Sequence, residues 1–587
     1  MPREVRNFAP EKEKSSNKQN NYKFIIKVKK KGDYKMKKNL CLAALAATTL
    51  LAGFSSCSSD DDDNNGNNNQ VTDENVVADD ASAIALVNGI YSHWQPLSSS
   101  FTFIIESASN KLISFEGEED EPGPVVSRFE QQPNTWYQVK IFNHLLLGVA
   151  QANEAITTVK NSLEAGKVSQ AGYNAAVGKA KLLRGLAYLK LVQLWGEIPV
   201  FTENGGSATE RKPIDDVFAQ IVSDLTDAES LLKDYDGDPR TPSKQAAQAL
   251  LARAYLFWGD NPLSQAEVAA IANSQTDPSF TTTPARLEKA VEYANKVINS
   301  GKLALDPDFS KLFGREYESN KRKTNEHLLT IAHDGDAYDA QGNHQTHCSW
   351  TFPFQNGENG SSLTDNHTEV ADDDLYDNWY AEFPNDKRLA KTYFTKVTNP
   401  EDGFTYTYRS PFYTPINGKG VDQSYDDAEN LEITYNSIDR IEIRYAEVLL
   451  TKAEALVQLG RNGEAAEPFN KLRTRAGIAT VSAPTFDQIK REWDYEFTYE
   501  QFDLINHARW KDYVASVKQV STYKHFPEDW ETSTGNTYNT AQRTFFAKVH
   551  KHLQAKYNNV RGKHYRQPIP TGLKGEDLGI TPQNPGY

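Results

Sequence analysis

Aromatic residues within polar, glycine-rich stretches are the first candidates for chemistry in this sequence. Trp94 lies in YSHWQPLSSSF, and Trp350 lies in HCSWTFPFQNGENG with Tyr338, His347 and Asn356 nearby. A sugar ring presents flat patches of C–H bonds that stack on aromatic faces, and its hydroxyls bind polar side chains around the rim. These five residues are the candidate ligand contacts. The alternative for each tryptophan is a hydrophobic plug that pins a long loop.

Paired carboxylates are the second candidates, because a glycosidase uses two of them about 5–5.5 Å or 6.5–9.5 Å apart. Glu447 and Glu454 share a helical face two turns apart, roughly 10 Å along the axis. Glu496 and Glu500 are i,i+4 neighbours on another predicted helix. Together with Arg444, these carboxylates are expected to form surface or inter-helix ion pairs. The sequence has no nucleophile elbow, P-loop or HExxH string, so it predicts a binding protein with no catalytic residues.

A group of histidines and aspartates raises the question of a metal ion. Its members are His333, Asp334, Asp336, His344, His347 and Cys348. Their spacing matches neither the zinc patterns nor the calcium-binding loop of EF-hands. We therefore predict no metal and no cofactor.

The N-terminal region has the layout of an export signal. Met36 begins MKKNLCLAALAATTLLAGFSSC, in which two lysines precede an apolar run too short to span a membrane stably. Residues 36–56 are thus a predicted signal peptide, and residues 1–35 an unstructured upstream extension, with Met1 or Met36 as the start. The small residues before Cys57 resemble a lipobox, so Cys57 is the predicted lipidation site. Residues 57–75, which include SSDDDDNN, form an acidic tether that resembles the signal for export to the outer face of the outer membrane.

The net negative charge of the chain argues against nucleic acid as a partner. From Cys57 onward the chain carries 51 Lys and Arg against 75 Asp and Glu, a net charge of −24. A surface this acidic repels a phosphate backbone, so nucleic-acid binding is disfavoured. Membrane attachment would come through the lipid at Cys57, because two or three acyl chains give durable anchoring.

The elements that must position these residues are mainly helical. Apolar periodicity predicts helix pairs in about 137–300 and 440–480, with Trp195, Trp258, Trp493 and Trp510 in the core. The pattern resembles tetratricopeptide packing, although the repeats are degenerate and discontinuous. Residues 95–133 are expected to be irregular. Residues of about 320–440 form a loop-rich insertion with little β structure, in which 404–415 alternate as a half-buried strand does.

Five segments in order resemble the SusD/RagB family of outer-membrane lipoproteins. They are RGLAYLKLVQLWGEIPV (184–200), SKQAAQALLARAYLFWGD (243–260), IRYAEVLLTKAEALVQLG (443–460), PFNKLRTRAG (468–477) and PIPTGLKGEDLGITPQNPGY (568–587). The resemblance runs from about residue 75 to the last residue. It implies a mainly α, SusD-like fold in a single domain, 76–587, with tetratricopeptide-like helix pairs that support the insertion.

The family also implies a function. Such proteins are lipid-anchored on the extracellular side of the outer membrane, bind a glycan and deliver it to a SusC-like, TonB-dependent barrel. Family members usually have Gly and Arg where this chain has Gln501 and Phe502, so close inference of the substrate is not supported. Two alternatives stay open, a RagB-like lid that captures peptides and a divergent glycoside hydrolase.

Overall fold

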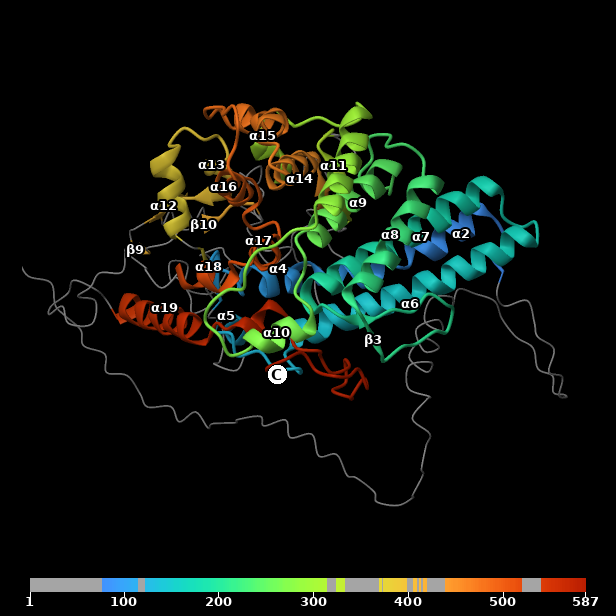
Figure 1. The fold of residues 1–587 in the computed structure, drawn as a ribbon, viewed down its shortest axis with the longest axis horizontal. Helices are drawn as coiled ribbons and strands as arrows, with labels where there is room; N and C mark the ends of the chain where they lie inside the picture. Colours follow the sequence, from blue (N-terminus) through green and yellow to red (C-terminus); the bar gives the residue numbers. More distant parts are fainter. Residues whose placement is uncertain are drawn as a thin grey trace, which may run out of the picture. The chain divides into compact units, whose positions relative to one another are not determined.

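Consecutive helices pack in pairs in the computed structural model of the chain, as the sequence predicts. Helix α6 (Trp136–Glu164) packs against α7 (Gln170–Trp195), and α8 (Ile214–Leu231) packs against both α7 and α9 (Lys244–Gly259). Figure 1 shows these helices side by side. The two predicted apolar stripes of α7 are buried along their length, because α7 is enclosed by α2 (Asp80–Asn88), α6 and α8.

The described residues belong to one compact unit, Ser59–Tyr587. They are 76–114, 122–313, 324–332, 369–371, 373–398, 405–408, 411–412, 415–419, 439–519 and 540–587. No helix in these ranges combines the length and apolar character needed to cross a bilayer. The mainly helical class is confirmed.

The two predicted groups of helices join through a contact that is distant in sequence. Helix α11 (Pro284–Asn299) packs against α9 on one side and against α14 (Tyr445–Gln458) on the other, and α14 packs against α15 (Asn462–Ala476). The partner of α11 is therefore a helix that follows the whole insertion. The insertion thus interrupts a continuous stack of helices.

The expectation of irregular structure over 95–133 is wrong. This segment contains η1 (Gln95–Leu97), α4 (Ser98–Glu106), β1 (Leu112–Ser114) and α5 (Pro122–Ser127). Helix α4 has the sequence SSSFTFIIE, whose serines and β-branched residues have modest helix propensity. Burial of Phe101, Ile104 and Ile105 in the main core supplies the stabilisation that propensity does not.

The C-terminal motif closes onto the end of α7. The Trp195 indole N–H donates to the Pro568 carbonyl at 2.8 Å, and the Asn584 amide donates to the Trp195 carbonyl at 3.0 Å. Helix α7 ends at Trp195 and is capped by Gly196, where φ is 76° and a Cβ would lie 2.3 Å from Arg566 Nε. Only glycine tolerates both conditions, which explains the LWG sequence at this corner.

The other elements are short. The helices are α3 (Tyr91–Trp94), α10 (Gln265–Ile271), η2 (Phe309–Phe313), α12 (Asp373–Glu382), α13 (Leu389–Thr392), α16 (Phe486–Phe497), α17 (Asp503–Trp510), α18 (Tyr513–Gln519), α19 (Thr540–Asn559) and η6 (Gly562–Tyr565). The paired strands are β1 with β5 (Glu369–Ala371), β2 (Ile198–Pro199) with β3 (Arg211–Lys212), β4 (His327–Ile331) with β11 (Arg440–Arg444), β6 (Tyr393–Phe394) with β10 (Ile416–Asn417), and β7 (Lys396–Thr398), β8 (Thr405–Tyr408) and β9 (Pro411–Phe412) in one sheet. The strand predicted within 404–415 is confirmed by β8.

Candidate functional site

Most of the predicted ligand contacts lie outside the described residues. These are Tyr338, His347, Trp350 and Asn356, together with the His/Asp/Cys group at 333–348 and the lipidation site Cys57. Of the insertion that carries them, the structure describes the two base strands, β4 and β11, and the segments 369–371, 373–398, 405–408, 411–412 and 415–419.

Trp94 does not have the surface position expected of a ligand contact. It ends α3, is 1% exposed and belongs to the main hydrophobic core. The guanidinium of Arg440 lies 5.7 Å from its ring centroid, and the next residue, Gln95, donates to the Ala332 carbonyl at 3.0 Å. An indole this buried has no free face for a sugar. Trp94 is therefore the hydrophobic plug of the alternative interpretation, next to the two residues, Ala332 and Arg440, at the ends of the insertion.

The insertion leaves and rejoins the scaffold through two paired strands. Strands β4 and β11 are antiparallel, with Ile331 opposite Arg440, so residues 332 and 439 lie next to each other. Asp439 accepts two hydrogen bonds from the Arg240 guanidinium, at 2.6 and 2.8 Å. This fork-to-fork pair fixes the returning end of the insertion against the segment that precedes α9.

Glu442 of β11 ties this strand to the helix pairs. It is buried and lies 2.9 Å from both Lys190 of α7 and Arg253 of α9. Burial opposes ionisation of Glu442, but the cations Lys190, Arg440 and Arg253 outweigh it and lower its pKa to about 2. The base of the insertion is thus bound to two helices by a fully ionised carboxylate.

A buried charge network connects the insertion to α16. We define it by ten residues, five cationic and five acidic: Arg388, Lys419, Arg444, Arg473 and Arg475 with Glu326, Asp386, Glu492, Glu496 and Glu500. All of these residues are buried or nearly so. Equal numbers of opposite charges allow each carboxylate to be paired away from water.

Arg388 and Lys419 are the two cations that the insertion contributes to the network. Arg388 has no exposed surface and lies 2.6 Å from Glu492 and 2.9 Å from Glu496 of α16. Its own neighbour Asp386 accepts from it at 2.7 Å. Lys419 donates to the Glu500 carboxylate at 2.7 Å. The insertion is thus attached to the scaffold by two buried cations as well as by its base strands.

Glu496 is the centre of the network. Burial alone would raise its pKa, but Arg475, Arg444 and Arg388 hold the pKa well below the ordinary value of a glutamate. Arg444 donates to Glu496 at 2.5 Å and to Glu326 at 2.9 Å, and so joins β11, α16 and the residue before β4.

The candidate carboxylate pairs are structural. Glu447 binds Arg253 of α9, and Glu454 binds Arg509 of α17, which confirms the predicted inter-helix ion pairs. They are buried rather than at the surface, and Arg444 binds Glu326, Glu496 and Glu500 instead of either of them. Helix α16 ends at Phe497, so Glu500 lies in the turn beyond the helix that was expected to contain it.

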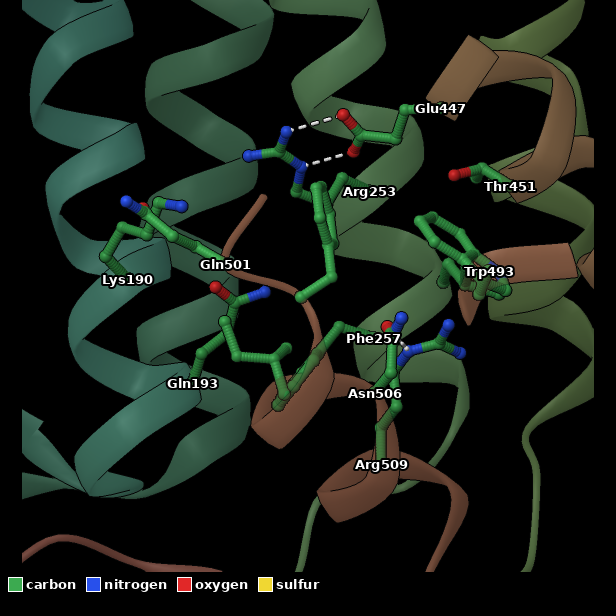
Figure 2. Close-up of a pocket in the computed structure, with 13 residues that line it drawn as sticks. Lys190, Gln193, Arg253, Phe257, Glu447, Thr451, Trp493, Gln501, Asn506 and Arg509 are labelled. Carbon is green, nitrogen blue, oxygen red and sulfur yellow. Dashed lines mark hydrogen bonds and ion pairs between the residues drawn. The ribbon is translucent and has the colours of Figure 1, made fainter. Parts of the chain in front are cut away.

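A small pocket lined by both polar and apolar side chains lies between α7, α9, α14 and the turn after α16. Figure 2 shows Gln193, Asn506 and the Arg253–Glu447 pair around it. Its volume is about 20 Å³, which is room for one or two water molecules. Small-molecule sites are typically about 300–1,000 Å³, so this pocket is part of the core and does not hold a sugar.

Asp494, Asp503 and His507 are the cluster of metal-ligating atoms found among the described residues. The Lys111 ammonium lies 3.1 Å from Asp494 and 3.4 Å from Asp503. A lysine therefore already supplies a cation to these carboxylates.

Gln501 and Phe502 stand where SusD/RagB family members usually have Gly and Arg, and the structure shows what the two residues do. Gln501 has a φ of 68°, in the left-handed region that favours glycine, and its backbone N–H donates to Glu106 at 2.6 Å. Phe502, in the position where arginine is usual, packs against Trp493 and Phe497. The backbone shape that a glycine would allow is thus kept by a non-glycine residue.

Comparison with known proteins decides the family. The SusD family model matches residues 273–587, which include the insertion, the network and the C-terminal motif. The chain belongs to the SusD family. A second model, described as starch-binding and associating with the outer membrane, matches residues 118–256 of this SusD-family chain.

Relatives of the chain agree with this assignment. A SusD-like protein of Bacteroides ovatus is 26% identical over 388 residues, which are 62% of this chain and 64% of the relative. The match thus spans less than two thirds of that relative. A solved SusD homolog from Bacteroides thetaiotaomicron superposes with a TM-score of 0.68 and 18% identity, covering 87% of this chain and 98% of that one. Surface glycan-binding protein A from the same organism, solved with laminarihexaose, has a TM-score of 0.61 at 17% identity and covers 86% and 99% of the two chains.

The network was missed by sequence reasoning, although its signal was present. Arg444 lies between Ile443 and Tyr445, and Glu496 lies between Tyr495 and Phe497. A charged residue at an apolar position of a helix or strand requires a buried partner. That requirement could have been stated before the partners were known.

The network predicts a large loss of stability when one of its charges is removed. We expect Arg388→Ala to lower the free energy of unfolding by about 3–5 kcal/mol, because Asp386, Glu492 and Glu496 would lose their shared cation. Arg461→Ala is the control. Arg461 pairs with Glu288 and Glu464 at an exposed site, and its loss should cost at most about 1 kcal/mol. Urea unfolding of both variants makes the measurement. Equal costs would show that the network does not hold the insertion.

Proposed function

We propose that the protein is a surface-exposed glycan-binding lipoprotein that captures oligo- or polysaccharide and delivers it to a SusC-like, TonB-dependent transporter. The observation that carries the proposal is the SusD family match, which spans the insertion together with α11, α14 and α16. The glycan class is supported by a structural relative solved with laminarihexaose. Binding without catalysis is supported by the candidate carboxylates, which are engaged in buried ion pairs.

The insertion is the proposed binding segment. Its two ends are fixed by β4 and β11, and two of its cations are buried in the charge network. A loop-rich segment on such a fixed base can present aromatic and polar side chains at low entropic cost. Trp350 is the proposed stacking residue, with Tyr338, His347 and Asn356 as its polar and aromatic neighbours.

The location and partner are proposed from the sequence and the family. Cys57 would carry the lipid, residues 57–75 would be the tether, and the folded domain would face the extracellular side above its barrel. The description of the second matching family as associating with the outer membrane supports this placement.

Trp350→Ala should weaken glycan affinity at least tenfold, about 1.4 kcal/mol, because the stacking face is lost. Affinity electrophoresis in gels containing neutral polysaccharides measures this, and circular dichroism checks that the fold is intact. Trp136→Ala is the control, since Trp136 is an exposed tryptophan at the start of α6, outside the insertion. Unchanged affinity of Trp350→Ala would remove the insertion as the binding surface.

The same gels separate the alternatives. A RagB-like, peptide-capturing lid would be retarded by no polysaccharide. A divergent glycoside hydrolase would release reducing ends when it is incubated with the polysaccharide that retards it.

Lipidation predicts a change of cell fraction. Wild-type protein expressed in a Bacteroides host should pellet with the outer membrane and incorporate labelled palmitate. Cys57→Ala should do neither, because no thiol is left to carry the lipid. Cys41→Ala is the matched control and should behave as the wild type. Palmitate incorporation by Cys57→Ala would place the anchor elsewhere.

A further inference from the structure

We propose that the exposed ring of Tyr380, on helix α12, is an additional stacking surface for a neutral glycan. The inference rests on the proposed function, because it takes the ligand to be a glycan. It adds a contact that lies within the described part of the insertion.

Tyr380 is one of three large hydrophobic residues that are strongly exposed among the described residues. It is 52% exposed, compared with 45% for Trp136 and 41% for Tyr557. Single exposed aromatic residues are common and need no explanation. Tyr380 differs from the other two in what lies behind its ring.

A series of aromatic contacts leads from the Tyr380 ring into the protein. Tyr380 stacks on Tyr376, with ring centroids 5.9 Å apart and planes 17° apart. The edge of Tyr376 meets Tyr393 at 5.4 Å, and Tyr393 in turn meets Trp379 at 6.3 Å and Tyr499 at 5.8 Å. Tyr393, Trp379 and Tyr499 are buried in one hydrophobic cluster. One face of Tyr380 is thus supported, and the ring presents its other side to solvent.

The supporting helix is itself firmly attached. The Trp379 ring stacks on Tyr495 of α16 at 4.6 Å, and the Tyr495 hydroxyl donates to Glu382 at 2.9 Å. Figure 1 shows α12 close to α13 and α16. A ring that is already held in place loses little conformational entropy when a ligand stacks on it.

Trp136 and Tyr557 lack this arrangement. No aromatic ring of the described residues stacks on either of them, and the Lys518 ammonium lies 5.2 Å from the centroid of the Tyr557 ring. A cation over the ring competes with a ligand for that face. They serve as controls with similar exposure.

The surroundings of Tyr380 favour a neutral glycan. Helix α12 carries Asp374, Asp377 and Glu382 and no basic residue, and Arg491 of α16 lies 3.9 Å from Glu382. Carboxylates accept hydrogen bonds from sugar hydroxyls, and the exposed amide of Asn378 both donates and accepts. The same acidic charges repel sulfated or uronic-acid polysaccharides.

Affinity electrophoresis tests the proposal with the full mature chain. The probes are laminarin, xyloglucan and starch, with polygalacturonate as the anionic comparison. For whichever neutral polysaccharide retards the wild type, we expect Tyr380→Ala to weaken affinity about fivefold, because the stacking face is lost. Tyr380→Phe should stay within about twofold, because the stacking face remains. Tyr557→Ala should match the wild type.

Three results would overturn the proposal. Wild-type retardation of Tyr380→Ala removes the Tyr380 surface while leaving the proposed function intact. Retardation by polygalacturonate above that by every neutral probe removes the neutral class. Absence of retardation of the wild type by every probe removes the proposed function and this inference with it. If Tyr380→Ala melts at a lower temperature, Tyr380→Leu replaces it, since leucine keeps apolar packing without a flat face. Wild-type retardation of Tyr380→Leu would equally count against the proposal.

Discussion

The fold depends on buried carboxylates that are held against buried cations, with Glu496 at their centre. Taking a carboxylate out of water costs several kcal/mol unless cations and hydrogen bonds replace the lost hydration. Glu496 meets that requirement with Arg388, Arg444 and Arg475, which come from the insertion, from β11 and from α15. Parts of the chain more than a hundred residues apart are therefore obliged to meet at one point. The network thus adds buried ion pairs to the base strands that attach the insertion to the helix pairs.

In this SusD-family chain the core and the insertion are therefore built by different interactions. The helix pairs provide a hydrophobic core that continues across the insertion through α9, α11 and α14. The base strands and the network fix where the insertion begins, returns and touches the scaffold. Trp94 belongs to this fixed base, since it packs under Arg440 while Gln95 binds Ala332. The aromatic side chains of the insertion are the proposed recognition residues, and this arrangement keeps them apart from the core.

The sequence predicted the helix pairs because apolar periodicity is local information. It failed over 95–133, where tertiary burial rather than propensity makes α4 helical, and it did not foresee α12 within the insertion. For the site, the sequence identifies aromatic residues in polar stretches but not whether they are buried. Trp94, a predicted ligand contact, is 1% exposed. Apart from Asp386, the partners of Arg388 and Arg444 are 52 to 118 residues away, and no local pattern identifies them. The sequence shows only that a charged residue among apolar neighbours requires a buried partner.

Hydrogen–deuterium exchange with and without a retarding neutral polysaccharide tests the central claim, that a fixed scaffold presents the insertion to the ligand. The account predicts slower exchange on ligand addition in peptides from 320–440. It also predicts unchanged exchange in α6, α7, α8 and α9, which hold the core and touch no ligand. Protection confined to those helices, with 320–440 unaffected, would contradict it.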